Sequence, residues 1–511
     1  MKEKKSFNIA GSAAMISILS VVSKAMGLMR VLFISWRFGQ GLYTDSYNSA
    51  IRITGIAMNV IGAALMTVMV PVLAHVKERH GNRGKLKFFN NISNIVLTIA
   101  VILMAGTMIF APSIVGLMYP GFSGDQLELT TRLVRIGSPI IVALGLMNVS
   151  SSYLHSYNIY RPYALMGIPF NLIYFIYLFV APPTIEGLMV ASVFAYFTQW
   201  LIQVPAIHNT NYRWQPLLDV NDKYVHRALR LVVPTAVGQA VQQINVIVDQ
   251  NLASGLAEGT VSALENSSKL NDAIIAIFIT GLTTVIFPLL SEAFEKNDHK
   301  KIGKILDDGI GFVFLITIPA MVGLMLLADD IVILLFQRDK FTQADALYTS
   351  SALVFYSVGL VANGMRHLIT KVFYSLNDTK TPMINGMIAV AFNIALNIAL
   401  VGPLGHRGLA LATSISITIS TTWMIYKLKE KIEEVDFVYY LKELIKVGIS
   451  SAVMGFVVYI TNSFLLGLGL DQLIRIALVV VLAAITYTAM VFLTRTRSAS
   501  ALISVIKKRR K

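Results

Sequence analysis

Residues 8–35 of the chain read NIAGSAAMISILSVVSKAMGLMRVLFIS, an apolar stretch that is long enough to cross a bilayer as a helix. Two cations, Lys24 and Arg30, lie inside this stretch. A charge at bilayer depth costs roughly 2.5–3.5 kcal/mol on insertion scales, so such a side chain normally faces a protein interior or a water-filled cavity. The stretch therefore predicts a membrane protein with a cationic cavity that attracts an anion.

The composition of the 511 residues points to the same class. Hydrophobic residues make up 55% of the chain and charged residues 14%, and the mean hydropathy is +0.66. This is too little polar surface to cover a soluble globule of that size, and the chain has no cysteine for disulfides or thiolate metal sites. Lys2, Lys4 and Lys5 resemble the start of a signal peptide, but the apolar run continues to about Trp36, which predicts an uncleaved first helix.

Apolar runs separated by glycine, proline or charge predict about fourteen transmembrane helices. Their approximate cores are 8–35, 46–75, 90–118, 129–157, 162–181, 186–207, 228–254, 260–292, 305–328, 347–374, 382–402, 407–427, 440–466 and 470–494. Basic residues gather in alternate loops, which predicts that both termini are cytoplasmic. The basic clusters lie at 77–87, 296–304, 427–431 and 507–511. The formal charge of +15 is thus explained by topology and by attraction to lipid headgroups, and we expect no nucleic-acid partner.

An internal repeat organises the chain. A shift of 217 positions superposes Arg52 on Lys269 and Pro71 on Pro288, and after a drift of a few residues Gly187 matches Gly408. The alternative, chance matching of apolar helices, explains single pairs but not a constant offset that pairs two intramembrane cations and two prolines. Two further matches are Asn171 with Asn393 and Trp200 with Trp423.

The repeat predicts an all-α polytopic fold with two parallel six-helix lobes and a substrate site at their interface. We expect an N-terminal lobe at 1–215, a C-terminal lobe at 216–432, and two additional helices with a basic cytoplasmic tail at 433–511. The two additional helices lie outside the repeat. Their apolar surfaces are expected to guide a long acyl or prenyl chain.

Several short motifs, in order along nearly the whole chain, resemble the MurJ (MviN) lipid II flippases of the multidrug/oligosaccharidyl-lipid/polysaccharide exporter superfamily. The motifs are SKAMGLMR at 23–30, TD at 44–45, VP at 70–71, LASG at 252–255, SKL at 268–270, FYS at 373–375, DTKTP at 378–382 and GPL at 402–404. The resemblance implies a V-shaped pair of lobes that moves undecaprenyl-diphosphate-linked peptidoglycan precursor from the inner to the outer leaflet by alternating access. It also accounts for two helices beyond the repeat.

The resemblance implies a diphosphate site at four cations. They are Lys24, Arg30, Arg52 and Lys269, with Ser23, Gly27, Asp45 and Asp272 as supporting residues. Lysine holds a phosphate as a point charge and arginine as a bidentate fork, and lysine stands at two positions where the family commonly has arginine. Two other roles remain open: Arg52 lies seven residues after Asp45 and could pair with it, and Lys269 lies close to Glu265 and Asp272 along its helix.

Gly27 lies midway between Lys24 and Arg30. These two cations are six residues apart and do not share a face of a straight helix, so a bend at Gly27 would be needed to bring them together.

Polar residues in the C-terminal half suggest an ion site. Asn245 and Asp249 are four residues apart, as are Asn393 and Asn397. Hard oxygen ligands suit sodium, and by resemblance to a sodium site in the MurJ family the ligands are Asp249, Asn393, Asn397, Leu409 through its carbonyl, and Thr413. Hydrogen bonding between helices is the other interpretation of these amides.

The predicted function is lipid II translocation in the bacterial cytoplasmic membrane, by a monomer without an enzymatic activity and with sodium as its one candidate cofactor. The alternatives are a flippase for another polyprenyl-linked glycan and a drug/cation antiporter of the same superfamily. An enzyme of polyprenyl chemistry would need clustered acids or histidines at a membrane face. Asp307-Asp308 and Asp329-Asp330 are the only adjacent aspartates, and both are expected at the edges of loops.

Overall fold

A computed structural model describes residues 2–180 and 182–496, and the basic tail at 497–511 lies outside them. Within that range the chain forms helices joined by turns and short loops, which confirms the all-α polytopic class. By their contacts the residues form two compact units. Unit 1 comprises Met1–Ser262 and Asp339–Phe341, and unit 2 comprises Ala263–Arg338 and Thr342–Lys511.

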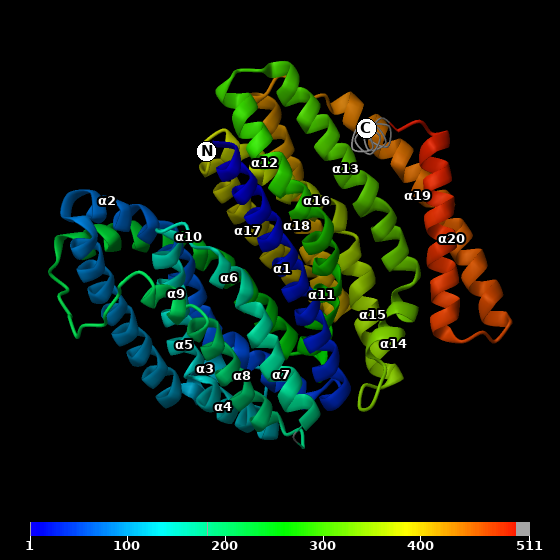
Figure 1. Ribbon diagram of the computed structural model, residues 1–511. Coiled ribbons are helices and arrows are strands. Elements are labelled where there is room, and N and C mark those ends of the chain that lie inside the picture. Colours follow the sequence, from blue (N-terminus) through cyan, green and yellow to red (C-terminus); the bar gives the residue numbers. More distant parts are fainter. Residues whose placement is uncertain (1, 181, 497–511) are drawn as a thin grey trace. The chain divides into compact units, whose positions relative to one another are not determined.

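Ten helices belong to unit 1 (Figure 1). They are α1 (Lys2–Phe38), α2 (Leu42–Ile109), α3 (Ala111–Met118), α4 (Gly124–Gly137), α5 (Ile140–His155), α6 (Arg161–Leu165), α7 (Gly167–Val180), α8 (Ile185–Leu201), α9 (Val204–His208) and α10 (Lys223–Ser254). A linker at 209–222 joins α9 to α10. The aliphatic and aromatic core of unit 1 lies between α2, α5 and the first half of α10, and includes Val72, Phe89, Tyr153 and Val225.

The length of α2, 68 residues, exceeds what one span requires, and the helix is interrupted at Gly81. Gly81 has φ 65° and ψ −168°, a conformation that a residue with a Cβ rarely adopts. The break lies in the basic segment at 77–87, between the second and third predicted spans. The single element α2 thus covers the second predicted span and most of the third.

Unit 2 begins within α11 and contains the remaining elements. They are α11 (Thr260–Ile274), the π-helix η1 (Ile275–Ile279), α12 (Thr280–Glu295), α13 (His299–Leu326), α14 (Ala328–Phe336), α15 (Gln343–Ser357), α16 (Leu360–Ser375), α17 (Lys380–Leu404), α18 (His406–Lys431), α19 (Phe437–Gly467) and α20 (Gln472–Leu493). The predicted span at 260–292 is therefore one helical run that contains a π-helical segment.

The two appended helices, α19 and α20, are fastened to unit 2 by apolar and polar contacts. Met454, Val458 and Val479 pack with Leu327 in a buried cluster. Arg475 of α20 forms a buried ion pair with Asp330 of α14, and Asn462 of α19 donates to the other Asp330 oxygen at 2.8 Å. Asp330, half-buried in the first turn of α14, is thus an anchor for α19 and α20.

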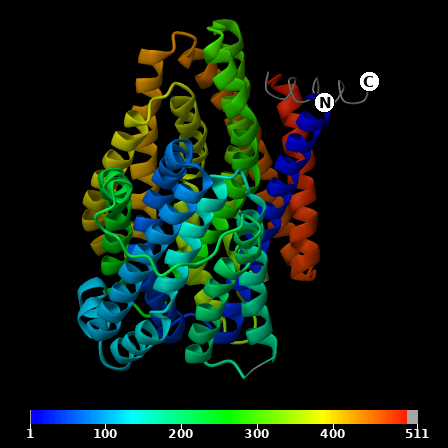
Figure 2. The ribbon, with the colours of Figure 1, turned by 60° about the vertical axis from the view of Figure 1, so that its left-hand side comes forward.

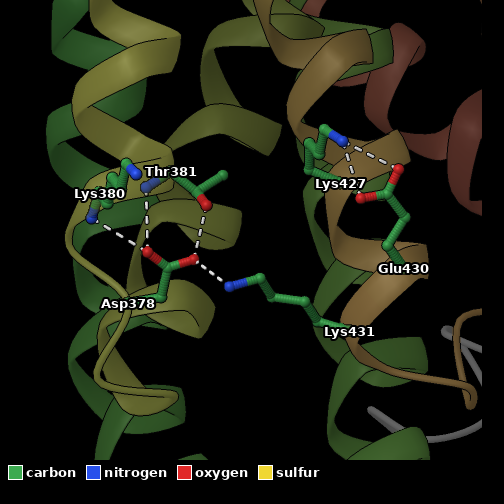
Figure 3. A network of polar contacts seen from close by, with 6 residues as sticks. All are labelled: Asp378, Lys380, Thr381, Lys427, Glu430 and Lys431. Carbon is green, nitrogen blue, oxygen red and sulfur yellow. Dashed lines mark hydrogen bonds and ion pairs between the residues drawn. The ribbon is translucent and has the colours of Figure 1, made fainter.

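The DTKTP motif begins α17 and ties it to the end of α18 (Figure 3). Asp378 Oδ1 accepts from the backbone N–H groups of Lys380 and Thr381, both at 3.0 Å. Its other oxygen accepts from Lys431 Nζ at 2.6 Å, and Lys427 pairs separately with Glu430 at 2.8 Å. The motif is therefore a helix cap and a clamp between helices.

Nine helices of the described residues are long and apolar enough to cross a membrane, or up to eleven when each bent pair is one span. Because α2 is counted here as one helix, the predicted number of fourteen transmembrane helices stays a prediction. Two bent pairs, α4 with α5 at 41° and α15 with α16 at 50°, occur about 220 residues apart. That separation matches the repeat, so both halves break the corresponding span.

Candidate functional site

Arg30 of α1 is half-buried against aromatic rings of α7. Its guanidinium carbon lies 4.8 Å from the ring centroid of Phe170 and 4.8 Å from that of Tyr174. The Tyr174 hydroxyl is 3.2 Å from that of Tyr47 on α2, which is 2.9 Å from Ser192 Oγ on α8. Aromatic faces attract a cation and hold it in place without neutralising its charge. We call Arg30, Phe170, Tyr174, Tyr47 and Ser192 the arginine box.

Lys24 lies on the same helix but in different surroundings. Its side chain is exposed, whereas Arg30 is half-buried. Helical structure continues through Gly27 without a break, and no atom of a neighbouring element lies within 4 Å of where a Gly27 Cβ would be. The helix therefore provides no break at Gly27 to bring the two cations onto one face.

Ser23 on α1 lies in close contact with Gly167 of α7. A Cβ added to Gly167 would be 1.7 Å from Ser23 Oγ, so α7 can come this near only with glycine at that position. Asn171 Nδ2 lies 3.5 Å from the Ser23 carbonyl and donates to Gly167 O at 2.7 Å. Ser23 thus helps to set the position of α1 against the helix that carries the aromatic rings.

Asp45 on α2 is buried and accepts two backbone hydrogen bonds. Gly259 N–H donates to Oδ2 at 2.7 Å and Ser262 N–H donates to Oδ1 at 2.8 Å. These amides lie at the start of α11, where helical N–H groups need acceptors, so the carboxylate caps α11. Arg52 is half-buried two turns further along α2.

Lys269 lies on α11 with about half of its side chain exposed and pairs with Glu265 one turn before it. The Nζ to Oε1 distance is 3.2 Å, and the exposed fractions are 46% and 22%. Asp272 is exposed and lies three residues before η1. The ion pair with Glu265 supports the interpretation that a nearby carboxylate neutralises Lys269. The π-helical segment η1 favours a functional role for this region, because such segments within α-helices are frequently found at functional sites.

The four predicted diphosphate ligands are divided between the two units. Lys24, Arg30 and Arg52 lie on α1 and α2 of unit 1, and Lys269 lies on α11 of unit 2. Their convergence on one diphosphate stays a prediction.

Four of the five residues predicted to bind sodium form one hydrogen-bonded chain between α17 and α18 in unit 2. Asn397 Nδ2 donates to Asn393 Oδ1 at 2.8 Å, and Asn393 Nδ2 donates to Thr413 Oγ1 at 3.2 Å. Thr413 Oγ1 in turn donates to the Leu409 carbonyl at 3.0 Å. These contacts support the inter-helix interpretation. They also bring amide, hydroxyl and carbonyl oxygens together, and hard oxygen ligands of this kind suit a sodium ion.

The fifth predicted sodium ligand, Asp249, belongs to α10 of unit 1. It accepts from Asn245 Nδ2 at 3.3 Å, one turn before it on the same helix. This contact is a local one within α10. A site that combines Asp249 with the unit 2 oxygens stays a prediction.

Sequence reasoning did not identify the aromatic members of the arginine box. Phe170 and Tyr174 are four residues apart and therefore share a face of α7, but aromatic residues in an apolar helix usually indicate packing. Polar hydroxyls at Tyr47, Tyr174 and Ser192 in otherwise apolar spans were the available signal. Only the tertiary structure shows that Phe170 and Tyr174 face the Arg30 guanidinium.

The sequence matches a family model described as lipid II flippase MurJ over residues 34–480. Relatives that bear the name probable lipid II flippase MurJ include the following two. The protein of Buchnera aphidicola subsp. Baizongia pistaciae (strain Bp) is 27% identical over 466 residues, covering 90% of this chain and 91% of the relative. That of Treponema pallidum (strain Nichols) is 28% identical over 451 residues, covering 84% and 83%.

Solved structures agree with these matches. A structure titled "Lipid II flippase MurJ, inward closed conformation" has a TM-score of 0.79 and 26% identity, covering 94% of this chain and 99% of its own. An inward-facing multidrug resistance MATE family transporter of the MOP superfamily has a TM-score of 0.68 and 14% identity, covering 82% of this chain. The second match shows a shared fold alone.

Proposed function

The chain belongs to the lipid II flippase MurJ family, and from this premise we propose that it moves undecaprenyl-diphosphate-linked peptidoglycan precursor from the inner to the outer leaflet of the bacterial cytoplasmic membrane. The observation that carries the proposal is the arginine box. An arginine inside an apolar span, held by ring faces rather than by a carboxylate, keeps its charge available to an anion.

The diphosphate is the part of the precursor that these cations recognise. Arg30 offers a planar fork of N–H donors that matches phosphate oxygens, and the exposed Lys24 adds a mobile point charge on the same helix. In this proposal Arg52 and Lys269 add the further positive charges that balance the diphosphate. Glu265 competes with the diphosphate for Lys269, so release of the headgroup returns Lys269 to its ion pair.

Translocation proceeds by alternating access, with the cation cluster opening first to one leaflet and then to the other. Asp45 holds the start of α11 through two buried hydrogen bonds. Through this cap, movement of α2 is transmitted to the helix that carries Lys269. The chain acts as a transporter rather than an enzyme, as a monomer with both termini cytoplasmic.

Sodium is the coupling ion in this proposal. Asn393, Asn397, Thr413 and the Leu409 carbonyl would hold it together with the Asp249 carboxylate, and the ion would supply a positive charge that the chain releases as it changes state. The support is the gathering of amide, hydroxyl and carbonyl oxygens between α17 and α18.

The appended helices are proposed to guide the undecaprenyl tail. Gly455 packs against α13, since a Cβ there would be 2.8 Å from Val322 Cγ1, whereas Gly448 has no neighbouring-element atom within 4 Å of its Cβ position. Gly448→Trp is therefore the variant that would block an apolar path on α19. Gly455→Trp would disturb packing instead.

Depletion of the native flippase in a bacterium that carries this chain tests the proposal. We expect the wild-type chain to restore growth and to prevent accumulation of lipid II on the inner leaflet, and Arg30→Ala to fail in both. Arg132→Ala is the matched control, because Arg132 is an exposed cation paired with Glu128 at 3.0 Å. Accumulation of another polyprenyl-linked glycan, with normal lipid II, would contradict the assignment of substrate.

A further inference from the structure

Unit 1 contains an apolar groove that is not part of the predicted transport site. Its volume is about 640 Å³, and α2, α5, α8, α9 and the linker at 209–222 form its walls. The lining residues are Phe89, Ser93, Asn94, Leu97, Leu146, Val149, Ser150, Trp200, Val204, Ile207, His208, Tyr212, Arg213 and Trp214. No acidic residue is among them, and Arg213 and His208 are the basic ones.

Three asparagines of α2 hold the linker in place as one wall of the groove. Asn90 donates to Arg213 O at 3.0 Å, and Asn91 both donates to and accepts from the Asp219 backbone at 2.7 Å. Asn94 donates to Gln215 O and Leu217 O, both at 2.8 Å, while its own oxygen accepts from Trp214 Nε1 at 3.0 Å.

These bonds satisfy the linker backbone and fix its course, so the groove is formed before any ligand enters. Both views show the linker as an extended green coil running beside the blue helices of unit 1 (Figures 1 and 2).

The groove changes from polar to apolar along its length. His208, Arg213 and Trp214 lie at the end next to the linker, and Leu97, Leu146 and Trp200 lie furthest from it along their helices. Phe89 and Leu97 are eight residues apart on α2, which corresponds to about 12 Å of helix. One leaflet of hydrocarbon is roughly 15 Å deep, so the groove extends through most of a leaflet.

We propose that this groove binds an anionic glycerophospholipid of the inner leaflet, with one acyl chain along Leu97, Leu146 and Trp200 and the phosphate beside Arg213. Three observations select this occupant. The length of the groove is most of the depth of one leaflet, its inner part offers no charge, and its polar end presents an exposed guanidinium with no acidic partner in the described residues. Basic pockets between helices on the cytoplasmic side bind anionic headgroups, and an exposed tryptophan beside the pocket suits the interface.

An undecaprenyl tail is the competing occupant, and its length exceeds the depth of one leaflet. The proposed phospholipid site lies within unit 1 alone. Its occupancy therefore does not depend on which lipid the chain transports, and it can fail without affecting the proposed function.

Tryptophan quenching by brominated acyl chains measures occupancy directly. The chain has four tryptophans, so phenylalanine at 36, 214 and 423 leaves Trp200 as a reporter inside the groove. A second protein that keeps only Trp423 reports contact with bulk lipid. Both are reconstituted in phosphatidylcholine vesicles with increasing brominated phosphatidylglycerol or brominated phosphatidylcholine.

We expect Trp200 to be half-quenched at an about fivefold lower mole fraction of brominated phosphatidylglycerol than of brominated phosphatidylcholine, since one basic side chain favours the anionic headgroup by about this factor. Trp423 should show no preference. In Arg213→Gln, the two brominated lipids should half-quench Trp200 at about the same mole fraction, while their acyl chains still quench it. The double variant Leu97→Phe with Leu146→Phe should reduce quenching of Trp200 to the level seen for Trp423. The volume-conserving pair Leu97→Ile with Leu146→Ile should keep the stronger quenching of Trp200.

Equal quenching of Trp200 by the two lipids, or a preference that survives Arg213→Gln, would overturn the proposal. Displacement of brominated phosphatidylglycerol by undecaprenyl phosphate at a lower mole fraction than by unlabelled phosphatidylglycerol would also overturn it, and would assign the groove to a prenyl chain.

Discussion

The hairpin of α7 and α8 in unit 1 and the hairpin of α17 and α18 in unit 2 are counterparts in the internal repeat. Gly187 and Gly408 occupy equivalent positions 221 residues apart, and each lies where a Cβ would collide with a neighbour. At the same offset, Ser192 Oγ donates to Leu188 O at 2.7 Å and Thr413 Oγ1 donates to Leu409 O at 3.0 Å. The two hairpins thus share a close helix contact and an inward hydroxyl.

Their hydroxyls have different partners. Ser192 lies beside Tyr47, which leads to Tyr174 and so to Arg30, whereas Thr413 accepts from Asn393, which accepts from Asn397. The position equivalent to Asn397 in the first repeat is Phe175, an apolar residue. One hairpin therefore supports a cationic side chain through aromatic rings, and the other gathers amide, hydroxyl and carbonyl oxygens. A few side chains thus give the two equivalent hairpins different polar surroundings.

The largest difference in stability between equivalent substitutions in the two hairpins is expected for Gly408→Ala compared with Gly187→Ala. A Cβ at Gly408 would lie 2.2 Å from the backbone carbonyl of Leu400, while a Cβ at Gly187 would lie 2.1 Å from the movable Tyr177 hydroxyl. Overpacking against backbone costs about 1–3 kcal/mol of stability. Gly408→Ala should lower the thermal midpoint clearly and Gly187→Ala much less, measured in detergent. Equal losses would show that the two contacts are equally rigid.

Sodium should distinguish the two repeats. A ligand present at ten times its dissociation constant stabilises the folded state by about 1.4 kcal/mol. Asn393→Ala and Asp249→Ala should abolish the rise in melting temperature on exchanging potassium for sodium, and Asn171→Ala, the counterpart in the first repeat, should retain it. A sodium response that survives in both variants would leave Asn393 with a hydrogen-bonding role alone.

A smaller effect is expected at the arginine box. Phe170→Leu keeps an apolar side chain but removes a ring face from Arg30, which should weaken binding of a short-chain lipid diphosphate about fivefold, as measured by titration calorimetry. Phe170→Tyr should restore affinity. Phe175→Leu on the same helix is the control, because Phe175 packs on Phe33 and not on Arg30. If both leucine variants weaken binding equally, packing of α7 rather than the cation contact is responsible.

The smallest effect concerns acid stability at Asp378. Burial alone would raise the pKa of this carboxyl, but hydrogen bonds from Lys431 and Thr381 lower its pKa to about 2. Because the ordinary pKa is about 3.9, the carboxylate contributes stability that is complete above that pH and is lost as the pH falls towards 2. The difference in melting temperature between wild type and Asp378→Asn should shrink over this interval. In Lys431→Met, the loss of stability on acidification should begin at a higher pH. A dependence of melting temperature on pH that is unchanged by Lys431→Met would exclude the contact between Lys431 and Asp378 as the cause of the acid effect.

Sequence reasoning located most helices because each has an apolar length that a bilayer requires, but the predicted cores at 129–157 and 347–374 are each broken into two helices, bent by 41° and 50°. The spacing of four residues placed Asn393 and Asn397 on one helix face, whereas Leu409 and Thr413 were added to them through the resemblance to a sodium site in the MurJ family. Sequence reasoning could not distinguish Asp330, a half-buried anchor of α19 and α20, from an exposed loop residue, because Asn462 and Arg475 lie more than 130 positions away. The aromatic faces around Arg30 were inaccessible for the same reason.

Translocation of lipid II in vesicles that contain only this chain tests the central claim most directly. With fluorescent lipid II placed in one leaflet, wild-type protein and Arg132→Ala should expose it in the other leaflet at equal rates, and Arg30→Ala should slow this by about tenfold or more, since a charge-assisted hydrogen bond contributes about 1.5–3 kcal/mol. Equal rates for Arg30→Ala and wild type, at equal protein incorporation, would contradict the assignment of the arginine box to the transported diphosphate.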